Sequence, residues 1–373
     1  MKKLFISLSM LVLSFSCLAG CASKEPETPP QSSVTSTAPT SASAPSDIPA
    51  PTETSAAADI ENIKIGYLTD RLGDNAVNDA FYSGAKRFMD ETGLEITVIE
   101  HTELQDYEIN ARALCQEGYD LIFLPFNKAG EMMIELAKEF PDTHFYVQDT
   151  DAGLPNFTSY KYRAYEAAFL TGAFSVLMNQ ELGGEAKSAF IGGMRNPTLE
   201  RAQYSYTAGS EYAGGKCTVV YVGSFTDLAK GKEVALQLYQ EGHRFIQAYA
   251  GGTGTGVFQA AESLPEGYYA LGEANGQFHL SDRIIASMVA NMGDTTYSVL
   301  KDFAEGNLES GYRQIGYSDG AVSIVYSPGK EDLIPQNVKD RIKELEDKVI
   351  SGEIECPTTE EEYNSFAKEF LNR

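Results

Sequence analysis

The 373-residue sequence contains no tryptophan and only four histidines. The Gly-x-Ser-x-Gly pattern, which in hydrolases holds a nucleophilic serine in a strand-to-helix turn, occurs once, at Gly316–Gly320, within a segment where we expect strands and no directly following helix. The histidines are scattered, and none forms the i, i+4 pair or the histidine–cysteine pairing of a metal site; they are His101, His144, His243 and His279. We therefore expect a protein that is not an enzyme, with no catalytic residue, no metal site and no other cofactor.

Basic residues and cysteines are also few. The chain has 29 lysines and arginines against 53 aspartates and glutamates, a formal net charge of −24, which argues against nucleic acid as a partner. Beyond the N-terminal segment, the cysteines are Cys115, Cys217 and Cys356, an odd number without CxxC spacing. This excludes a disulfide scaffold and a zinc site, and leaves open one bridge with one free thiol.

The N-terminus has the layout of a secretory signal: Lys2-Lys3, an apolar run from Leu4 to Leu18, and a small-residue site before Cys21. The run is shorter than the roughly 20 residues of a membrane span. The site resembles the bacterial lipobox, so we predict a signal over 1–20 and a lipid anchor on Cys21 at the outer face of the cell membrane. An ordinary cleaved signal with an incidental cysteine is the alternative.

Residues 21–58 are rich in Ser, Thr, Pro and Ala, and we predict a disordered tether there. The remaining chain, from Asp59 to Arg373, is long enough for two lobes. A duplication supports this, because Thr97–Gly130 and Thr218–Gly256 share one pattern. The pattern of each copy predicts a strand, an Asp that could cap a helix (Asp106 or Asp227), an amphipathic helix and a second strand. We predict two α/β lobes with a ligand cleft at the strand ends.

Polar residues follow several predicted strands. Asp70, Asn75 and Asn78 follow the strand Asn62–Tyr67, and Asp149 follows Thr143–Val147. They are either ligand-binding groups at the cleft or ordinary turn formers and helix caps.

The glycine-rich loop Gly251–Gly256 follows another predicted strand. It lacks the Lys-Ser/Thr of a phosphate loop, since Val257-Phe258 comes next. It is either a helix N-terminus that binds a ligand oxygen or a tight turn. Further along, we expect helices at Tyr160–Met178, Leu199–Ala213, Asp282–Phe303 and Val338–Ser351, and strands within Tyr312–Tyr326.

Several segments together resemble the basic membrane protein family of substrate-binding lipoproteins. They include IGYLTD with GDNAVND, EGYDLIFLPF, FIGGM, YVGSFTDLAKGKEVALQLYQEG and AGGTGTGV. The resemblance implies the type I periplasmic-binding-protein fold, with two doubly wound parallel-sheet lobes joined by a three-crossover hinge. It further implies lobe boundaries of 59–159 plus 275–310 and 160–274 plus 311–373.

The resemblance also implies site residues. Phe225 matches an aromatic that stacks on the nucleobase, and Gly252 and Gly254 match a loop beside the sugar. Asp70, Asn75, Asn78 and Asp149 fall where relatives present polar groups, and Glu273 and Asn275 are adjacent candidates. Three positions depart from the family pattern: Val77 replaces a second stacking aromatic, and Ala274 and Ala290 replace an Asp and a Lys that grip the ribose.

Together these features predict a monomeric, membrane-anchored lipoprotein that closes two lobes over a small ligand. The ligand that fits the resemblance best is a purine nucleoside or related nucleobase compound. It would pass the ligand to the permease and ATPase of an ABC importer. The alternative is a surface sensor or interaction lipoprotein that has the same fold and no role in transport.

Overall fold

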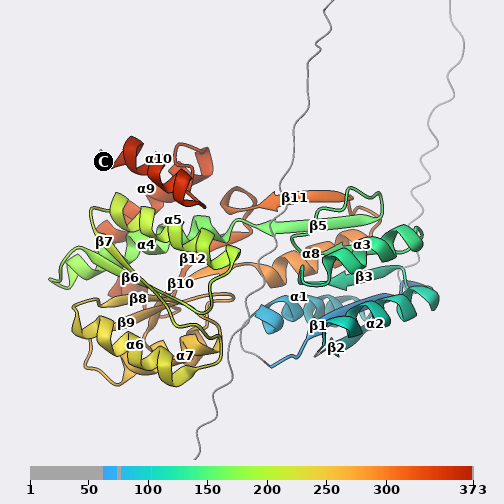
Figure 1. Ribbon diagram of the computed structural model, residues 1–373, viewed down its shortest axis with the longest axis horizontal. Helices are drawn as coiled ribbons and strands as arrows, with labels where there is room; N and C mark the ends of the chain where they lie inside the picture. Colours follow the sequence, from blue (N-terminus) through green and yellow to red (C-terminus); the bar gives the residue numbers. More distant parts are fainter. Residues whose placement is uncertain (1–61, 74–76, 102, 372–373) are drawn as a thin grey trace, which may run out of the picture. The chain divides into compact units, whose positions relative to one another are not determined.

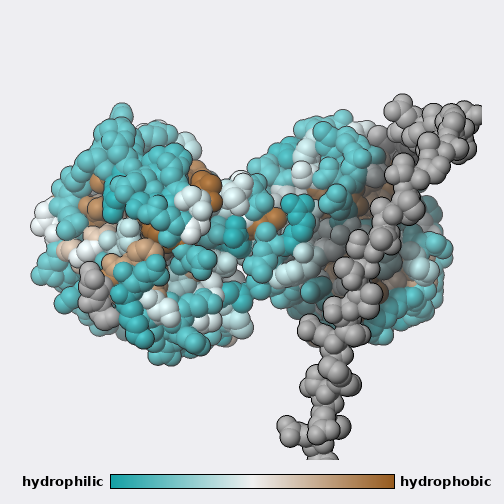
Figure 2. Space-filling model, turned by 90° about the horizontal axis from the view of Figure 1, so that it is seen from above, coloured by the Kyte–Doolittle hydropathy of each residue, from teal (hydrophilic) through white to brown (hydrophobic). Residues whose placement is uncertain are grey.

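The computed structural model describes residues 62–73, 77–101 and 103–371 (Figure 1). The predicted signal 1–20, the tether 21–58 with Cys21, and the site candidate Asn75 lie outside the described residues. Within the described ranges, no helix combines the length and apolarity needed to cross a membrane. The face drawn in Figure 2 is mostly hydrophilic, with hydrophobic residues in small separate patches.

The first lobe is built on a six-stranded sheet in the order β11-β5-β4-β3-β1-β2, with every neighbouring pair parallel. Alternate strand residues face opposite sides. Tyr67 and Phe123 pack with the helices α1 and α8, whereas Leu68 and Ile122 pack with α2 and α3. The elements are β1 (Ile65–Asp70), α1 (Val77–Thr92), β2 (Ile96–His101), α2 (Leu104–Gln116), β3 (Leu121–Leu124), α3 (Gly130–Glu139), β4 (His144–Val147), β5 (Phe157–Tyr162), α8 (Met292–Ala304) and β11 (Gly311–Ile315).

The second lobe is built on a six-stranded sheet in the order β12-β10-β9-β8-β6-β7, parallel except for β12 against β10. Ala248 and Ala260 belong to the core on the α6–α7 side, and Phe174 and Ile342 to the core on the α4–α9 side. The elements are α4 (Ala164–Glu181), β6 (Lys187–Gly192), α5 (Pro197–Tyr212), β7 (Lys216–Tyr221), α6 (Leu228–Gln240), β8 (Phe245–Tyr249), α7 (Gly252–Glu262), β9 (Tyr269–Gly272), η2 (Phe278–Leu280), β10 (Ile284–Ala290), η3 (Tyr317–Asp319), β12 (Val322–Tyr326), η4 (Glu331–Leu333), α9 (Gln336–Ser351) and α10 (Glu360–Phe370).

The two sheets have equivalent strand orders, with β1, β2 and β3 of the first lobe matching β6, β7 and β8 of the second. The duplicated segments are therefore β2-α2-β3 and β7-α6-β8. The prediction of two α/β lobes with parallel-dominated sheets is confirmed. One detail of the duplication is wrong: Asp227 is the N-cap of α6, but Asp106 lies inside the first turn of α2, whose N-cap is Glu103.

The chain changes sheets after β5, β10 and β11, which differs from the predicted boundaries. The ranges 59–159 plus 275–310 and 160–274 plus 311–373 assign β10 to the first lobe and β11 to the second, whereas strand pairing gives the reverse. The boundaries, which the resemblance implied, place all three crossovers too early in the chain. Separately, the expected helix Asp282–Phe303 is wrong in its first part. Ile284–Ala290 is a strand buried at every residue, and periodicity cannot distinguish a continuous apolar strand from a buried helix.

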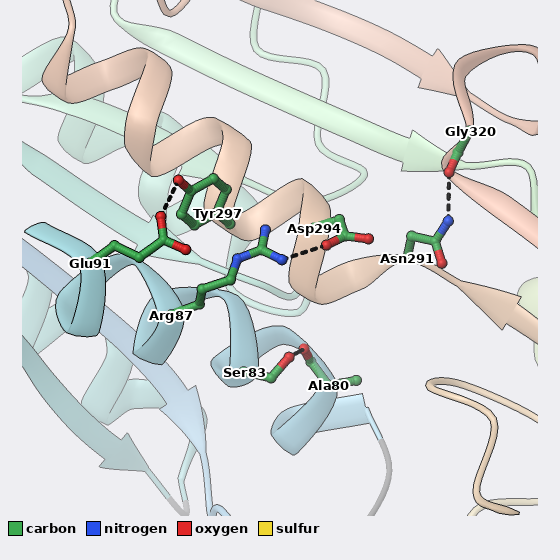
Figure 3. A network of polar contacts seen from close by, with 8 residues as sticks. All are labelled: Ala80, Ser83, Arg87, Glu91, Asn291, Asp294, Tyr297 and Gly320. Carbon is green, nitrogen blue, oxygen red and sulfur yellow. Dashed lines mark hydrogen bonds and ion pairs between the residues drawn. The ribbon is translucent and has the colours of Figure 1, made fainter.

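Hydrogen bonds fix the chain where it changes sheets. After β10, the Asn291 N–H donates to the Ala321 carbonyl oxygen at 2.8 Å, and the Asn291 side-chain amide donates to the Gly320 carbonyl oxygen at 2.6 Å (Figure 3). After β5, the Arg163 N–H donates to the Ile315 carbonyl oxygen at 2.8 Å. Neighbouring crossovers are thus tied to one another.

Helix α8, which follows the second crossover, packs tightly on α1. A Cβ atom at Gly84 would lie 2.0 Å from the Gly293 carbonyl oxygen, so only glycine allows this approach. Beside this contact, Arg87 is 2.8 Å from the Asp294 carboxylate, and its guanidinium lies 3.9 Å from the centre of the Tyr297 ring (Figure 3). This contact holds α8, and with it one end of the hinge, against the first lobe.

Candidate functional site

A cavity of about 100 Å³ lies where the carboxyl ends of strands from both sheets meet the first turns of helices. Open α/β sheets bind ligands outside the carboxyl ends of their strands, so this is the candidate ligand site. Of the predicted site residues, Asp149 and Glu273 line it, as do the three departures Val77, Ala274 and Ala290. The other lining residues are Gln148, Lys161, Tyr162, Ala164, Tyr165, Thr198, Arg201, Tyr249, Met288 and Met292.

Asp149 is held in place by two side chains of the first lobe. Its carboxylate accepts a hydrogen bond from the Tyr312 hydroxyl at 3.0 Å and lies 3.2 Å from the Lys161 ammonium. Its backbone has a φ of 48°, a left-handed conformation that a turn directly after β4 imposes. Burial, and after it the Asp149 charge, raises the pKa of Tyr312 to about 12, so this phenol stays protonated and donates.

Glu273 follows β9 and is 5 % exposed. Its carboxylate accepts a hydrogen bond from the Gly251 N–H at 2.9 Å, which links it to the glycine-rich loop. Ala274 comes next, with a φ of 57°, and its carbonyl oxygen accepts from the Ala290 N–H at 3.1 Å. Because burial and then the Glu273 charge raise the pKa of the lining residue Tyr249, its phenol also stays neutral.

Asp70 and Asn78 do not line this cavity. The Asp70 carboxylate accepts from the Tyr107 hydroxyl at 2.6 Å and pairs with the Lys128 ammonium. Burial and, second, the bond to Asp70 raise the pKa of Tyr107. Asn78, in the first turn of α1, accepts a long 3.4 Å bond from the Thr69 hydroxyl. These residues lie at the end of β1, as predicted, in a separate polar cluster.

Phe225, Gly252 and Gly254 come together beside the cavity without lining it. The half-buried Phe225 ring packs on Gly193, where a Cβ atom would lie 2.3 Å from it. The Phe225 carbonyl oxygen accepts from the Thr253 N–H at 3.0 Å, which joins the loop to the N-terminus of α7. Asn275 is exposed and also lies outside the cavity lining.

Seven polar lining residues are absent from the predicted site: Gln148, Lys161, Tyr162, Tyr165, Thr198, Arg201 and Tyr249. A position at the end of a strand, which located Asp149 and Glu273, also applies here, since Tyr249 ends β8 and Lys161 lies near the end of β5. Thr198 and Arg201 lie at the start of α5, the helix after β6. The prediction rests on carboxylates, amides and glycines at strand ends, which leaves out cations, hydroxyls and phenols; Gln148, an amide directly after β4, fits the pattern but is not among the predicted residues.

Cys115, Cys217 and Cys356 are free, so the disulfide that the sequence left open does not form. Burial raises the pKa of Cys115 and of Cys217 to about 11, which keeps both as thiols. No group of three His, Cys, Asp or Glu side chains among the described residues could hold a metal ion.

Comparisons with known proteins agree with this architecture. The family model described as ABC transporter substrate-binding protein PnrA-like matches residues 65–360. Basic membrane protein A of Borreliella burgdorferi is 29 % identical over 318 residues, covering 83 % of this chain and 91 % of that protein. Basic membrane protein A1 of Borrelia garinii subsp. bavariensis is 28 % identical over 316 residues, covering 82 % and 91 %.

Among solved structures, an ABC transporter solute-binding protein from Aeropyrum pernix K1 is similar, with a TM-score of 0.71 and 25 % identity. It covers 83 % of this chain and 98 % of that one. A transcriptional activator of the comK gene from Bacillus halodurans shares the fold, with a TM-score of 0.65 and 24 % identity over 77 % of this chain and 97 % of that one. The fold therefore occurs in proteins with different described roles.

Proposed function

Because the chain belongs to the PnrA-like family of ABC transporter substrate-binding proteins, we propose that it captures a purine nucleoside or related nucleobase compound outside the cytoplasm. It then delivers this ligand to the permease and ATPase of an ABC importer. In this proposal Cys21 carries the lipid anchor, and the protein acts as a monomer.

The observation that carries the proposal is the cavity lined by polar residues of both sheets. Asp149 and Lys161 come from the first lobe, and Arg201 and Glu273 from the second. A ligand that contacts both lobes at once stabilises the closed state and shifts the population towards it. At about 100 Å³ the cavity is smaller than the roughly 300–1,000 Å³ usual for ligand sites. Binding therefore requires the lining residues to move apart.

We assign the nucleobase to the neighbourhood of Phe225. Its ring is half-buried and its position is set by packing on Gly193. Aromatic rings stack on bases with little dependence on which base is bound. In the same proposal Gly252 and Gly254 lie beside the sugar, and Asp70, Asn75, Asn78, Asp149, Glu273 and Asn275 supply hydrogen bonds.

A thermal-shift screen of the full-length chain tests the ligand class, using purine and pyrimidine nucleosides, free bases, ribose and unrelated metabolites. A ligand at 100 times its dissociation constant stabilises the folded state by about 2.7 kcal/mol. We expect nucleosides to raise the melting temperature. Stabilisation by ribose or unrelated compounds alone contradicts the nucleobase assignment, and no stabilisation by any compound favours the sensor or interaction alternative.

The substitution Phe225→Leu tests the stacking role. Base–aromatic stacking is worth about 1–3 kcal/mol, so we expect nucleoside affinity, measured by calorimetry, to fall by roughly 5- to 150-fold. Phe370→Leu is the matched control, because Phe370 is half-buried on α10 and lies outside the cavity lining. Equal nucleoside affinities for the two variants would remove Phe225 from the site.

A further inference from the structure

We infer that the ligand carries an anionic group, a carboxylate or a phosphate, and that Arg201 binds this group in the cavity. The inference rests on the proposed function, because it names the chemical class of the ligand within the same site. It adds a charged group to a ligand that the proposed function describes by its base and its sugar.

Arg201 is a half-buried cation at the cavity with no carboxylate partner among the described residues. Its one hydrogen bond to a side chain is a 3.3 Å contact from Nη2 to the Thr198 hydroxyl on the same helix. The nearby Arg195 differs, since it pairs with the Glu200 carboxylate at 3.3 Å and lies 4.3 Å from the centre of the Tyr221 ring. The Arg201 guanidinium has five N–H donors, so most of them remain for a ligand.

The two acids of the cavity are already engaged. Asp149 lies 3.2 Å from the Lys161 ammonium and accepts from the Tyr312 hydroxyl. Glu273 accepts from the Gly251 N–H at 2.9 Å. Lys161 and Asp149 pair with one another, and Glu273 is bonded to a backbone N–H, so the Arg201 guanidinium can donate to a ligand anion.

The backbone adds positive potential at the same place. Residues from the first turns of four helices line the cavity: Val77 of α1, Ala164 of α4, Thr198 of α5 and Met292 of α8. The N-terminus of a helix carries a partial positive charge, and its free N–H groups bind anions. In α4 and α8 no side chain caps these N–H groups, whereas in α5 the Asn196 side chain already accepts from the Thr198 and Leu199 N–H groups. The helix ends therefore support the anion site that Arg201 defines.

The rest of the lining suits the uncharged part of such a ligand. Ala274, Met288 and Ala290 are buried and apolar. A planar guanidinium binds carboxylates and phosphates through two parallel hydrogen bonds. A nucleobase compound with an acidic substituent, either a nucleoside monophosphate or a nucleobase carboxylate, combines both features.

Calorimetric titration of the full-length chain with matched ligand pairs tests the inference. The first pair is adenosine and adenosine 5′-monophosphate; the second is uracil and uracil-6-carboxylate. Inorganic phosphate and acetate are titrated alone. Hydrogen bonds to a charged group are stronger than those between neutral groups. We therefore expect the acidic member of one pair to bind about 10- to 100-fold more tightly than its neutral partner. The pair that responds identifies phosphate or carboxylate as the anion.

Arg201→Gln is expected to abolish this preference, Arg201→Lys to keep part of it, and Arg195→Gln, the matched control outside the cavity, to leave it unchanged. Unaltered melting temperatures of the ligand-free variants show that they fold.

If neutral and acidic members bind equally, or if Arg201→Gln keeps the preference, the inference is overturned while the proposed function stands. If only the simple anions bind, and do so through Arg201, the nucleobase assignment fails and the anion site stands. If nothing binds, both are overturned.

Discussion

The two copies of the β-α-β segment fold alike but differ in how their helix meets the next helix. In the second copy α6 and α7 touch through backbone: a Cβ atom at Gly256 would lie 2.0 Å from the Leu228 carbonyl oxygen, and one at Gly231 would lie 2.3 Å from the Thr253 carbonyl oxygen. In the first copy α2 and α3 meet through side chains, including a 2.6 Å contact between Arg112 and Glu139.

This difference matters because each copy positions different candidate groups. The α6–α7 contact fixes the N-terminus of α7, which binds the Phe225 carbonyl oxygen through the Thr253 N–H. The first copy positions Asp70 through side chains alone, namely Tyr107 of α2 and Lys128. The two copies thus share one fold, but only in the second copy does close backbone packing position an aromatic candidate, Phe225.

The largest expected effect comes from Gly256→Ala. The added methyl group would collide with the Leu228 carbonyl oxygen at 2.0 Å and the Lys232 nitrogen at 2.8 Å, both of them backbone atoms that cannot rotate away. Overpacking of this kind costs roughly 1–3 kcal/mol and sometimes more. We expect a loss of unfolding free energy of about 3 kcal/mol or more in urea denaturation, together with weaker nucleoside binding.

Gly118→Ala in the first copy is the matched control. Gly118 has a φ of 73° and open space around it, so the substitution adds backbone strain of roughly 1–2 kcal/mol but no collision. A similar loss of stability in the two variants would mean that the α6–α7 contact relaxes easily, and the contrast between the copies would then disappear.

Acid should weaken both lobes through one histidine in each, the half-buried His144 and the buried His243. Burial lowers the pKa of His144 in β4 to about 4; burial and then Lys187 lower the pKa of His243, just before β8, to about 4. The unfolded chain has histidine pKa values near 6.5, so between pH 6.5 and 4 it binds more protons than the folded chain. The stability that each neutral histidine contributes is therefore complete above pH 6.5 and is lost as the pH falls towards 4.

We expect each histidine to account for about 2–3 kcal/mol of this loss. His144→Gln and His243→Gln should each flatten the dependence of unfolding free energy on pH, measured in urea from pH 7 to 4.5. Amide exchange should assign the effect of His144 to β4 and that of His243 to β8. Variants that follow the wild-type pH dependence would show that neither histidine is responsible.

The sequence predicted the arrangement of the fold well where hydrophobic periodicity was clear. The helix Leu199–Ala213 lies within about two residues of α5, and the duplicated segment located β7, α6 and β8. It failed at β10, because a strand buried on both faces has no alternation. The lobe boundaries are a separate error, because the resemblance that implied them places all three crossovers too early in the chain.

The cavity was predicted in position and only partly in composition. Asp149 and Glu273 follow strands, which sequence patterns can locate. Arg201 reaches the cavity from α5, and nothing in its local sequence separates it from Arg195, which pairs with Glu200. Which of two neighbouring cations lacks a partner depends on tertiary packing, and a sequence pattern does not contain this information.

The smallest expected effect distinguishes the two aspartates that the duplication aligns. The Asp227 carboxylate accepts from the Lys230 N–H at 3.0 Å and caps α6, whereas Asp106 lies in the first turn of α2 and its helix has no side-chain cap. Loss of an N-cap costs about 1 kcal/mol, and loss of a charge near a helix N-terminus about 0.3–1 kcal/mol when exposed. Asp227→Ala should therefore lower the unfolding free energy by about 1 kcal/mol, and Asp106→Ala by less than half of that. Since α6 packs against α7, whose Thr253 N–H binds the Phe225 carbonyl oxygen, only Asp227→Ala should also weaken nucleoside binding in calorimetry. Equal losses of stability and unchanged binding would mean that the two helix starts are equivalent after all, and that the contrast between the copies lies in the glycine contacts alone.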